Sequence, residues 1–238
     1  MMFLEIDDLE LQLNAWRLRV SLTLGQGECL ALIGPSGAGK STLLSLIAGF
    51  EEPRRGSIQI NGRAIDHLDP ASRPVTIMFQ ENNLFNHLSL YDNVALGCHP
   101  GLKLNASHKV RIEQAMVATE LTQIASRLPA EVSGGERQRA ALARCLVQQR
   151  PLLLLDEPFA NLDPRLRHEM HSLVDDLRKA NGLTVVIVTH LPDEISRIAE
   201  RTVFIHDGRV LEHGPTAELL ARPRTAELIH YLKFTPQP

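Results

Sequence analysis

The chain has 238 residues, of which 44% are hydrophobic and 22% are charged, and this composition is that of an ordinary globular protein with a sizeable core. A net charge of −3 without a basic stripe argues against a DNA or RNA partner, and three widely spaced cysteines indicate neither a disulfide framework nor a zinc site. The acidic N-terminus is unlike a signal peptide and no apolar run approaches the roughly 20 residues that cross a bilayer, so we expect a cytoplasmic protein that reaches a membrane only through a partner.

The N-terminal part of the chain has the pattern of antiparallel strands. Apolar and polar residues alternate over residues 3–33, which is the period of half-buried strands, and a glycine-rich turn lies at residues 25–27. Residues 56–63 repeat the alternation and contain an Asn-Gly turn. We therefore predict an N-terminal antiparallel β subdomain.

A phosphate-binding loop follows the apolar run at residues 29–33. It fits the pattern G-x-x-x-x-G-K-S and lies between a predicted strand and a predicted helix at residues 41–48, as this motif requires. The glycines let backbone N–H groups point at phosphate oxygens, while Lys40 adds a positive charge and Ser41 offers a hydroxyl to Mg²⁺. The residues predicted to hold the phosphates are Gly34, Pro35, Ser36, Gly37, Ala38, Gly39, Lys40, Ser41 and Thr42.

Residues 86–132 contain few strand signals and are predicted to be a helical insertion. The pattern predicts a long helix at residues 109–125, and Pro129 returns the chain to the core. We therefore expect an α-helical subdomain inserted into the α/β core.

The segment Val-Ser-Gly-Gly-Glu at residues 132–136 has two roles in our interpretation. Ser133 and Glu136 form a capping box for a helix over residues 134–147. Capping does not explain the two glycines, because each weakens a first turn by about 1 kcal/mol relative to alanine. We predict that the N–H groups of Gly134 and Gly135 also approach a phosphate at the positive end of the helix, with the Ser133 hydroxyl beside them.

The second half of the chain predicts parallel strands and a long helix. Residues 152–155 and 185–188 are wholly apolar runs, typical of strands that are covered on both faces. Between them an Asp-Pro pair at residues 163–164 opens a helix, which an Asn-Gly pair at residues 181–182 closes. The expected parts of one domain, residues 1–238, are a β-rich edge (about 1–30 and 56–79), the helical subdomain (about 86–148) and the core (29–50 and 150–220).

Acidic residues and a histidine end these two strands. The carboxyl ends of parallel strands meet at the edge where α/β sheets bind ligands, so Asp156, Glu157 and His190 are expected together there. We predict that Asp156 holds Mg²⁺, directly or through water, and that Glu157 orients and polarises the attacking water. We expect His190 to hydrogen-bond the γ-phosphate and to sense its presence.

This order of motifs resembles the nucleotide-binding subunits of ABC transporters over nearly the whole chain. Residues 132–136 match the family's signature motif, Gln80 matches its Q-loop glutamine, and residues 160–163 match its D-loop. The resemblance implies a P-loop NTPase fold, ATP and Mg²⁺ as ligands, and a head-to-tail homodimer closed by ATP. It also implies that Gln80 contacts Mg²⁺ and the attacking water and reports to the membrane partner. The residues implied to contact ATP from the other copy are Ser133, Gly134, Gly135, Glu136 and Asp163.

Two positions depart from the family pattern. Glu136 stands where the signature usually has glutamine. A carboxylate that faces ATP would modestly weaken closure of the dimer, whereas one that is folded back on the Ser133 N–H would leave closure unchanged. We favour the folded-back arrangement. The position of the usual adenine-stacking aromatic falls on Leu11. Trp16 is the nearby aromatic residue large enough to stack on a purine, and both stacking and simple packing remain open for it.

Within the family, the sequence most resembles the ATP-binding subunits of bacterial thiamine importers. The likeness rests on residues 34–50, 80–85, 93–97 and 101–106, and all but the first of these fall where a membrane subunit should dock. It implies a transmembrane permease and a periplasmic thiamine-binding protein as partners, and a peripheral location on the inner face of the membrane. The alternatives are importers of iron, sulfate, molybdate or polyamines, a soluble ABC ATPase, a small-molecule kinase and a binding module without catalysis.

Overall fold

The computed structural model describes residues 2–80 and 83–234, with backbone alone at residues 192–194. Residues 81 and 82, in the stretch 80–85 that carried part of the resemblance, lie outside the described residues. The strands are β1 (Met2–Leu13), β2 (Trp16–Gly25), β3 (Cys29–Ile33), β4 (Arg55–Ile60), β5 (Arg63–Ala64), β6 (Val75–Met78), β7 (Leu152–Asp156), β8 (Thr184–Val188), β9 (Arg201–His206) and β10 (Arg209–Pro215). The helices are α1 (Lys40–Ala48), α2 (Leu90–Ala95), α3 (Ala106–Ala118), α4 (Gly134–Leu146), α5 (Pro164–Asn181), α6 (Pro192–Ile198), α7 (Thr216–Ala221) and α8 (Ala226–Phe234), with short 3₁₀ turns at Pro70–Ser72, Thr122–Ile124 and Pro129–Glu131.

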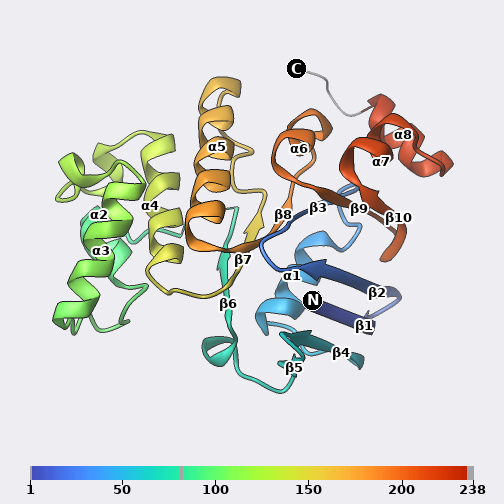
Figure 1. Ribbon diagram of the computed structural model, residues 1–238, viewed down its shortest axis with the longest axis horizontal. Helices are drawn as coiled ribbons and strands as arrows, with labels where there is room; N and C mark the ends of the chain where they lie inside the picture. Colours follow the sequence, from blue (N-terminus) through green and yellow to red (C-terminus); the bar gives the residue numbers. More distant parts are fainter. Residues whose placement is uncertain (1, 81–82, 235–238) are drawn as a thin grey trace.

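The described strands form one sheet in the order β5-β4-β1-β2-β10-β9-β3-β8-β7-β6 (Figure 1). Strands β9, β3, β8, β7 and β6 run parallel to one another, whereas β1 is antiparallel to both β2 and β4. The predicted P-loop NTPase fold, with a parallel core sheet and an antiparallel β subdomain, is confirmed. The predicted turn at residues 61–62 connects β4 to β5.

Alternate residues of the core strands pack on opposite faces of the sheet. In β3, Leu30 and Leu32 join the hydrophobic cluster around α1, whereas Ala31 and Ile33 join the cluster that contains the buried face of α5. Because side chains alternate along a strand, a wholly apolar run of this kind must be covered on both sides. This sandwich fixes β3, β7 and β8 in register, so that their carboxyl ends lie at the same edge.

Helix α5 has the predicted boundaries because both of its ends are capped. The Asp163 side chain accepts a hydrogen bond from the N–H of Leu166, Pro164 occupies the first turn, and Gly182 adopts a left-handed conformation (φ 62°) after the last turn. These local signals are the ones that the sequence carries.

Helices α2, α3 and α4 form the predicted helical insertion, seen at one end of the molecule in Figure 1, with a hydrophobic cluster of their own. The helix predicted at residues 109–125 is wrong at both ends, because α3 begins at Ala106 and ends at Ala118. Thr119 bonds back to the Ala115 carbonyl through its hydroxyl, and Glu120 then takes a left-handed conformation (φ 58°), which stops the helix. None of the described helices combines the length and apolar character that a membrane crossing requires.

Candidate functional site

The phosphate-loop residues turn from the end of β3 into the start of α1, and two glycines make the turn possible. A Cβ on Gly34 would lie 2.0 Å from the Ile205 carbonyl oxygen of β9. A Cβ on Gly39 would lie 2.9 Å from both Trp16 and Leu18, and Gly39 has a φ of 105°. A side chain at residue 34 would collide with the backbone of β9, and one at residue 39 would be strained by the positive φ and crowded by β2 side chains, so the loop is held close against β9 and β2.

Lys40 lies in the first turn of α1 with its side chain only 6% exposed. Its Nζ donates hydrogen bonds to the carbonyl oxygens of Gly34 and Pro35, at 2.8 and 2.9 Å. Burial lowers the pKa of this ammonium, while the nearby carboxylates of Glu157 and Asp156 raise it. The loop therefore wraps around a buried cation, which suits a ligand with several negative charges.

Ser41 and Asp156 meet although they are far apart in the sequence. The Ser41 hydroxyl donates to Asp156 Oδ1 at 3.0 Å, from the start of α1 to the end of β7. Burial raises the pKa of Asp156, an effect that the Ser41 hydrogen bond opposes. A hydroxyl and a carboxylate beside a phosphate loop are oxygen donors of the kind that Mg²⁺ prefers, so the residues present fit this ion.

Glu157 and His190 come together because β7 and β8 pair in register. Asp156 pairs with Val188, and the N–H of Glu157 donates to the Val188 carbonyl at 3.1 Å. Beyond this point His190 Nδ1 lies 3.4 Å from Glu157 Oε2. Glu157 has a left-handed backbone (φ 44°), a strained conformation of the kind that concentrates at functional sites.

The phosphate loop and Glu157 border a hollow of about 370 Å³, whose described lining includes neither Asp156 nor His190. Its described lining consists of Leu13, Trp16, Ser36, Gly37, Gly39, Lys40, Ser41, Thr42 and Glu157. Trp16 is half-buried and forms a wall of the hollow, a position that permits both of its predicted roles, whereas Leu11 is buried in the core. Leu13 was missed, although its pairing with Trp16 across the β1–β2 hairpin follows from the strand pattern.

The signature residues form the predicted capping box at the start of α4. Ser133 Oγ accepts the Glu136 N–H at 3.3 Å, and Glu136 Oε2 accepts the Ser133 N–H at 2.7 Å. Glu136 is therefore folded back, as we favoured. The described lining of the phosphate-loop hollow includes none of residues 133–136, so within one copy of the chain the two motifs do not share a pocket.

Asp163 and Gln80 also lie apart from the described lining of the hollow. Asp163 is exposed and caps α5, and Gln80 is exposed just beyond the end of β6. Arg167, which the sequence analysis missed, donates to the carbonyl oxygens of Phe159 and Leu162 at 3.3 and 2.8 Å and so holds the loop before Asp163. The sequence offered one signal for this role, because Arg167 lies four residues after the predicted N-cap Asp163, one helical turn from the preceding loop.

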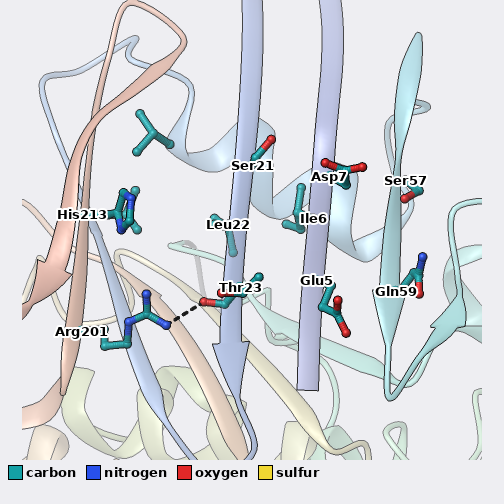
Figure 2. A pocket seen from close by; sticks show the side chains of 12 residues that line it. Glu5, Ile6, Asp7, Ser21, Leu22, Thr23, Ser57, Gln59, Arg201 and His213 are labelled. Carbon is teal, nitrogen blue, oxygen red and sulfur yellow. Dashed lines mark hydrogen bonds between the residues drawn. The ribbon is translucent and has the colours of Figure 1, made fainter. Parts of the chain in front are cut away.

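A second hollow, of about 470 Å³, lies between β1, β2 and β4 on one side and β9 and β10 on the other (Figure 2). Arg201 crosses part of it and donates to the Thr23 carbonyl at 3.0 Å. Although this hollow has the larger volume, it lacks a phosphate-binding loop and a buried lysine. The chemistry, rather than the volume, therefore places the candidate site at the phosphate loop.

Comparisons with known proteins agree with this geometry. A family model described as ABC transporter matches residues 18–160. A Photobacterium profundum protein named thiamine import ATP-binding protein ThiQ is 49% identical over 209 residues, covering 88% of this chain and 87% of that protein. A Brucella suis protein of the same name is 44% identical over 229 residues, covering 96% and 95%. The solved dimeric ATP-binding cassette MJ0796, bound to ADP and Pi, is 27% identical with a TM-score of 0.76 and covers 90% of this chain and 98% of its own.

Proposed function

Since this chain belongs to the ABC transporter family of ATP-binding proteins, we propose that it is the ATP-hydrolysing subunit of an importer and that the imported solute is thiamine. One observation carries the ATPase assignment. The phosphate loop and Glu157 line one hollow, and Asp156 is hydrogen-bonded to Ser41 of that lining, although these residues come from distant parts of the chain. The thiamine assignment is supported by the names of two relatives that match most of this chain.

Each predicted residue of the ATP site has a proposed task. Lys40 and the N–H groups of residues 34 and 36–42 bind the β- and γ-phosphates, while Ser41 and Asp156, with Gln80, hold Mg²⁺. When bound, Mg²⁺ neutralises charge that develops on the phosphates. Glu157 accepts a hydrogen bond from the attacking water and orients it. His190, 3.4 Å from that carboxylate, donates to the γ-phosphate and keeps Glu157 in position.

We further propose that two copies of the chain close over ATP head to tail. The signature residues 133–136 and Asp163 lie outside the phosphate-loop hollow of their own copy, which suits a role at the other copy's site. The printed title of the MJ0796 structure describes a dimer with ADP and Pi, and this similarity supports the same arrangement here. In this proposal residues 1–238 act as one nucleotide-binding domain, with Trp16 beside the adenine.

The proposed partners follow from the importer assignment. They are a transmembrane permease on the inner face of the membrane and, through it, a periplasmic thiamine-binding protein. The exposed residues Phe50 and Phe79 pack together with ring centroids 5.8 Å apart, next to Gln80. Such exposed aromatic side chains suit a protein partner at this surface.

The decisive experiment measures ATP hydrolysis by the complex purified with its permease in lipid vesicles. We expect stimulation by the thiamine-loaded binding protein, and none by the same protein without thiamine or by a complex that carries Glu157→Gln. Hydrolysis that responds instead to another solute and its binding protein would refute the thiamine assignment. A complex that binds ATP but never hydrolyses it would refute the assigned activity.

A further inference from the structure

The Ser133 hydroxyl makes one more hydrogen bond than a capping box requires. Besides accepting the Glu136 N–H, Ser133 Oγ lies 2.7 Å from Glu136 Oε2, the same oxygen that accepts the Ser133 N–H. An ionised carboxylate can only accept, so the hydroxyl must be the donor. A serine hydroxyl has a single proton. In this structure the Ser133 hydroxyl donates that proton in a hydrogen bond to Glu136 Oε2.

Glu136 is held in its charged form. The hydrogen bond from the Ser133 side chain and the one from its backbone lower the pKa of this carboxyl, and the positive charges of Arg127 and Arg139 act in the same direction. The carboxylate is therefore ionised at neutral pH. A hydrogen bond to an ionised acceptor is about twice as strong as one between neutral groups, so Glu136 holds the hydroxyl more strongly than a neutral amide would.

A phosphate oxygen of ATP also only accepts hydrogen bonds. Ser133 can therefore bind a phosphate only after its proton has turned away from Glu136. The carboxylate also occupies the N-terminal end of α4, where the N–H groups of Gly134 and Gly135 would otherwise favour an anion.

Resting on the proposed two-copy site, we propose that Glu136 is a positioning residue that holds the Ser133 hydroxyl away from ATP and so opposes closure of the dimer. The bond from the Ser133 N–H to Glu136 would by itself be neutral for dimer closure. The second bond, from the Ser133 hydroxyl, opposes closure because it must be broken before the hydroxyl can bind ATP. Each closed dimer contains two such sites, so the effect counts twice.

The test measures the dissociation constant of the ATP-bound dimer by sedimentation, in a chain whose hydrolysis is blocked by Glu157→Gln. Adding Glu136→Gln keeps an acceptor for the Ser133 N–H, because glutamine also completes a capping box, but removes the ionised acceptor. We expect dimerisation to tighten about tenfold per site, hence roughly a hundredfold for the dimer, with at most a small fall in melting temperature, because the neutral amide still caps α4 but loses the charge that complements the helix dipole. The matched control is Glu131→Gln, because Glu131 caps a neighbouring 3₁₀ turn through the Leu128 N–H at 2.8 Å. This control should change the dissociation constant less than twofold.

A double mutant separates the hydroxyl from simple charge. If Glu136 acts through the hydroxyl, Glu136→Gln should have no further effect in a Ser133→Ala chain, whereas an effect of charge alone would persist there. The inference is overturned if Glu136→Gln still tightens the dimer in the Ser133→Ala chain. It is also overturned if Glu136→Gln and Glu131→Gln change the dissociation constant equally. If the parent Glu157→Gln chain forms no dimer with ATP at all, the proposed two-copy site itself fails, and this outcome is distinct from the other two.

Discussion

Arg73 offers a stringent test of how the phosphate-loop helix is anchored. Its guanidinium is only 2% exposed and donates to four backbone carbonyls. Two belong to the last turn of α1, Leu46 and Ile47, at 2.7 and 3.0 Å, and two belong to the segment before β6, Leu68 and Asp66, both at 2.9 Å. A positive charge at the carboxyl end of a helix also complements the helix dipole.

We predict that Arg73→Met lowers the free energy of unfolding by about 3–5 kcal/mol. Each buried carbonyl that loses its donor costs about 1–3 kcal/mol. The total cost for the four carbonyls is smaller than four times this value for two reasons. Burying the charge of Arg73 is itself unfavourable, as its lowered pKa indicates. The Leu46 carbonyl also keeps its hydrogen bond from the Gly49 N–H at 3.3 Å. For a chain of this size the loss corresponds to roughly 6–20 °C in melting temperature.

Urea unfolding followed by circular dichroism measures this free energy, and thermal melts check it. Arg63→Met is the matched control, because Arg63 is exposed on β5 and its replacement should change stability by no more than about 0.5 kcal/mol. Arg73→Lys should fall between the two, since one ammonium cannot reach all four carbonyls. If Arg73→Met and Arg63→Met are equally stable, the guanidinium does not anchor α1 and the reasoning is wrong.

Three further predictions concern the site and its support. Glu157→Gln should keep ATP binding, slow hydrolysis by about 10²–10⁴-fold and trap an ATP-bound dimer; a variant that stays monomeric with ATP and active would contradict the role of this carboxylate. Lys40→Ala should lose ATP affinity because it removes the cation buried in the loop, and unchanged binding by calorimetry would count against the phosphate-binding role. Burial lowers the pKa of His171 from 6.5 to about 4, so the unfolded chain gains a proton before the folded one and stability should fall as the pH drops from 6.5 to 4, by up to about 1.4 kcal/mol per pH unit. His171→Gln should flatten this part of the pH profile of urea unfolding, and an identical profile would show that His171 does not contribute.

Local sequence signals predicted much of the fold. The Asp-Pro and Asn-Gly pairs predicted both ends of α5, because caps act over one turn of helix and leave their mark in neighbouring residues. The apolar runs also predicted parallel core strands, since strands that are buried on both faces consist mainly of apolar residues. The end of α3 was missed because a left-handed conformation at Glu120 is not a strong preference of glutamate.

The sequence by itself determined the fold class, the phosphate loop and the two acidic residues at the end of β7, because each depends on residues that are adjacent in the chain. Only the tertiary structure decided which side chains meet. The Ser41–Asp156 bond joins residues 115 positions apart, and the approach of His190 to Glu157 depends on the register of β7 against β8. The structure likewise decided that Glu136 accepts hydrogen bonds from both the hydroxyl and the N–H of Ser133, because this depends on the orientation of one carboxylate rather than on residue spacing.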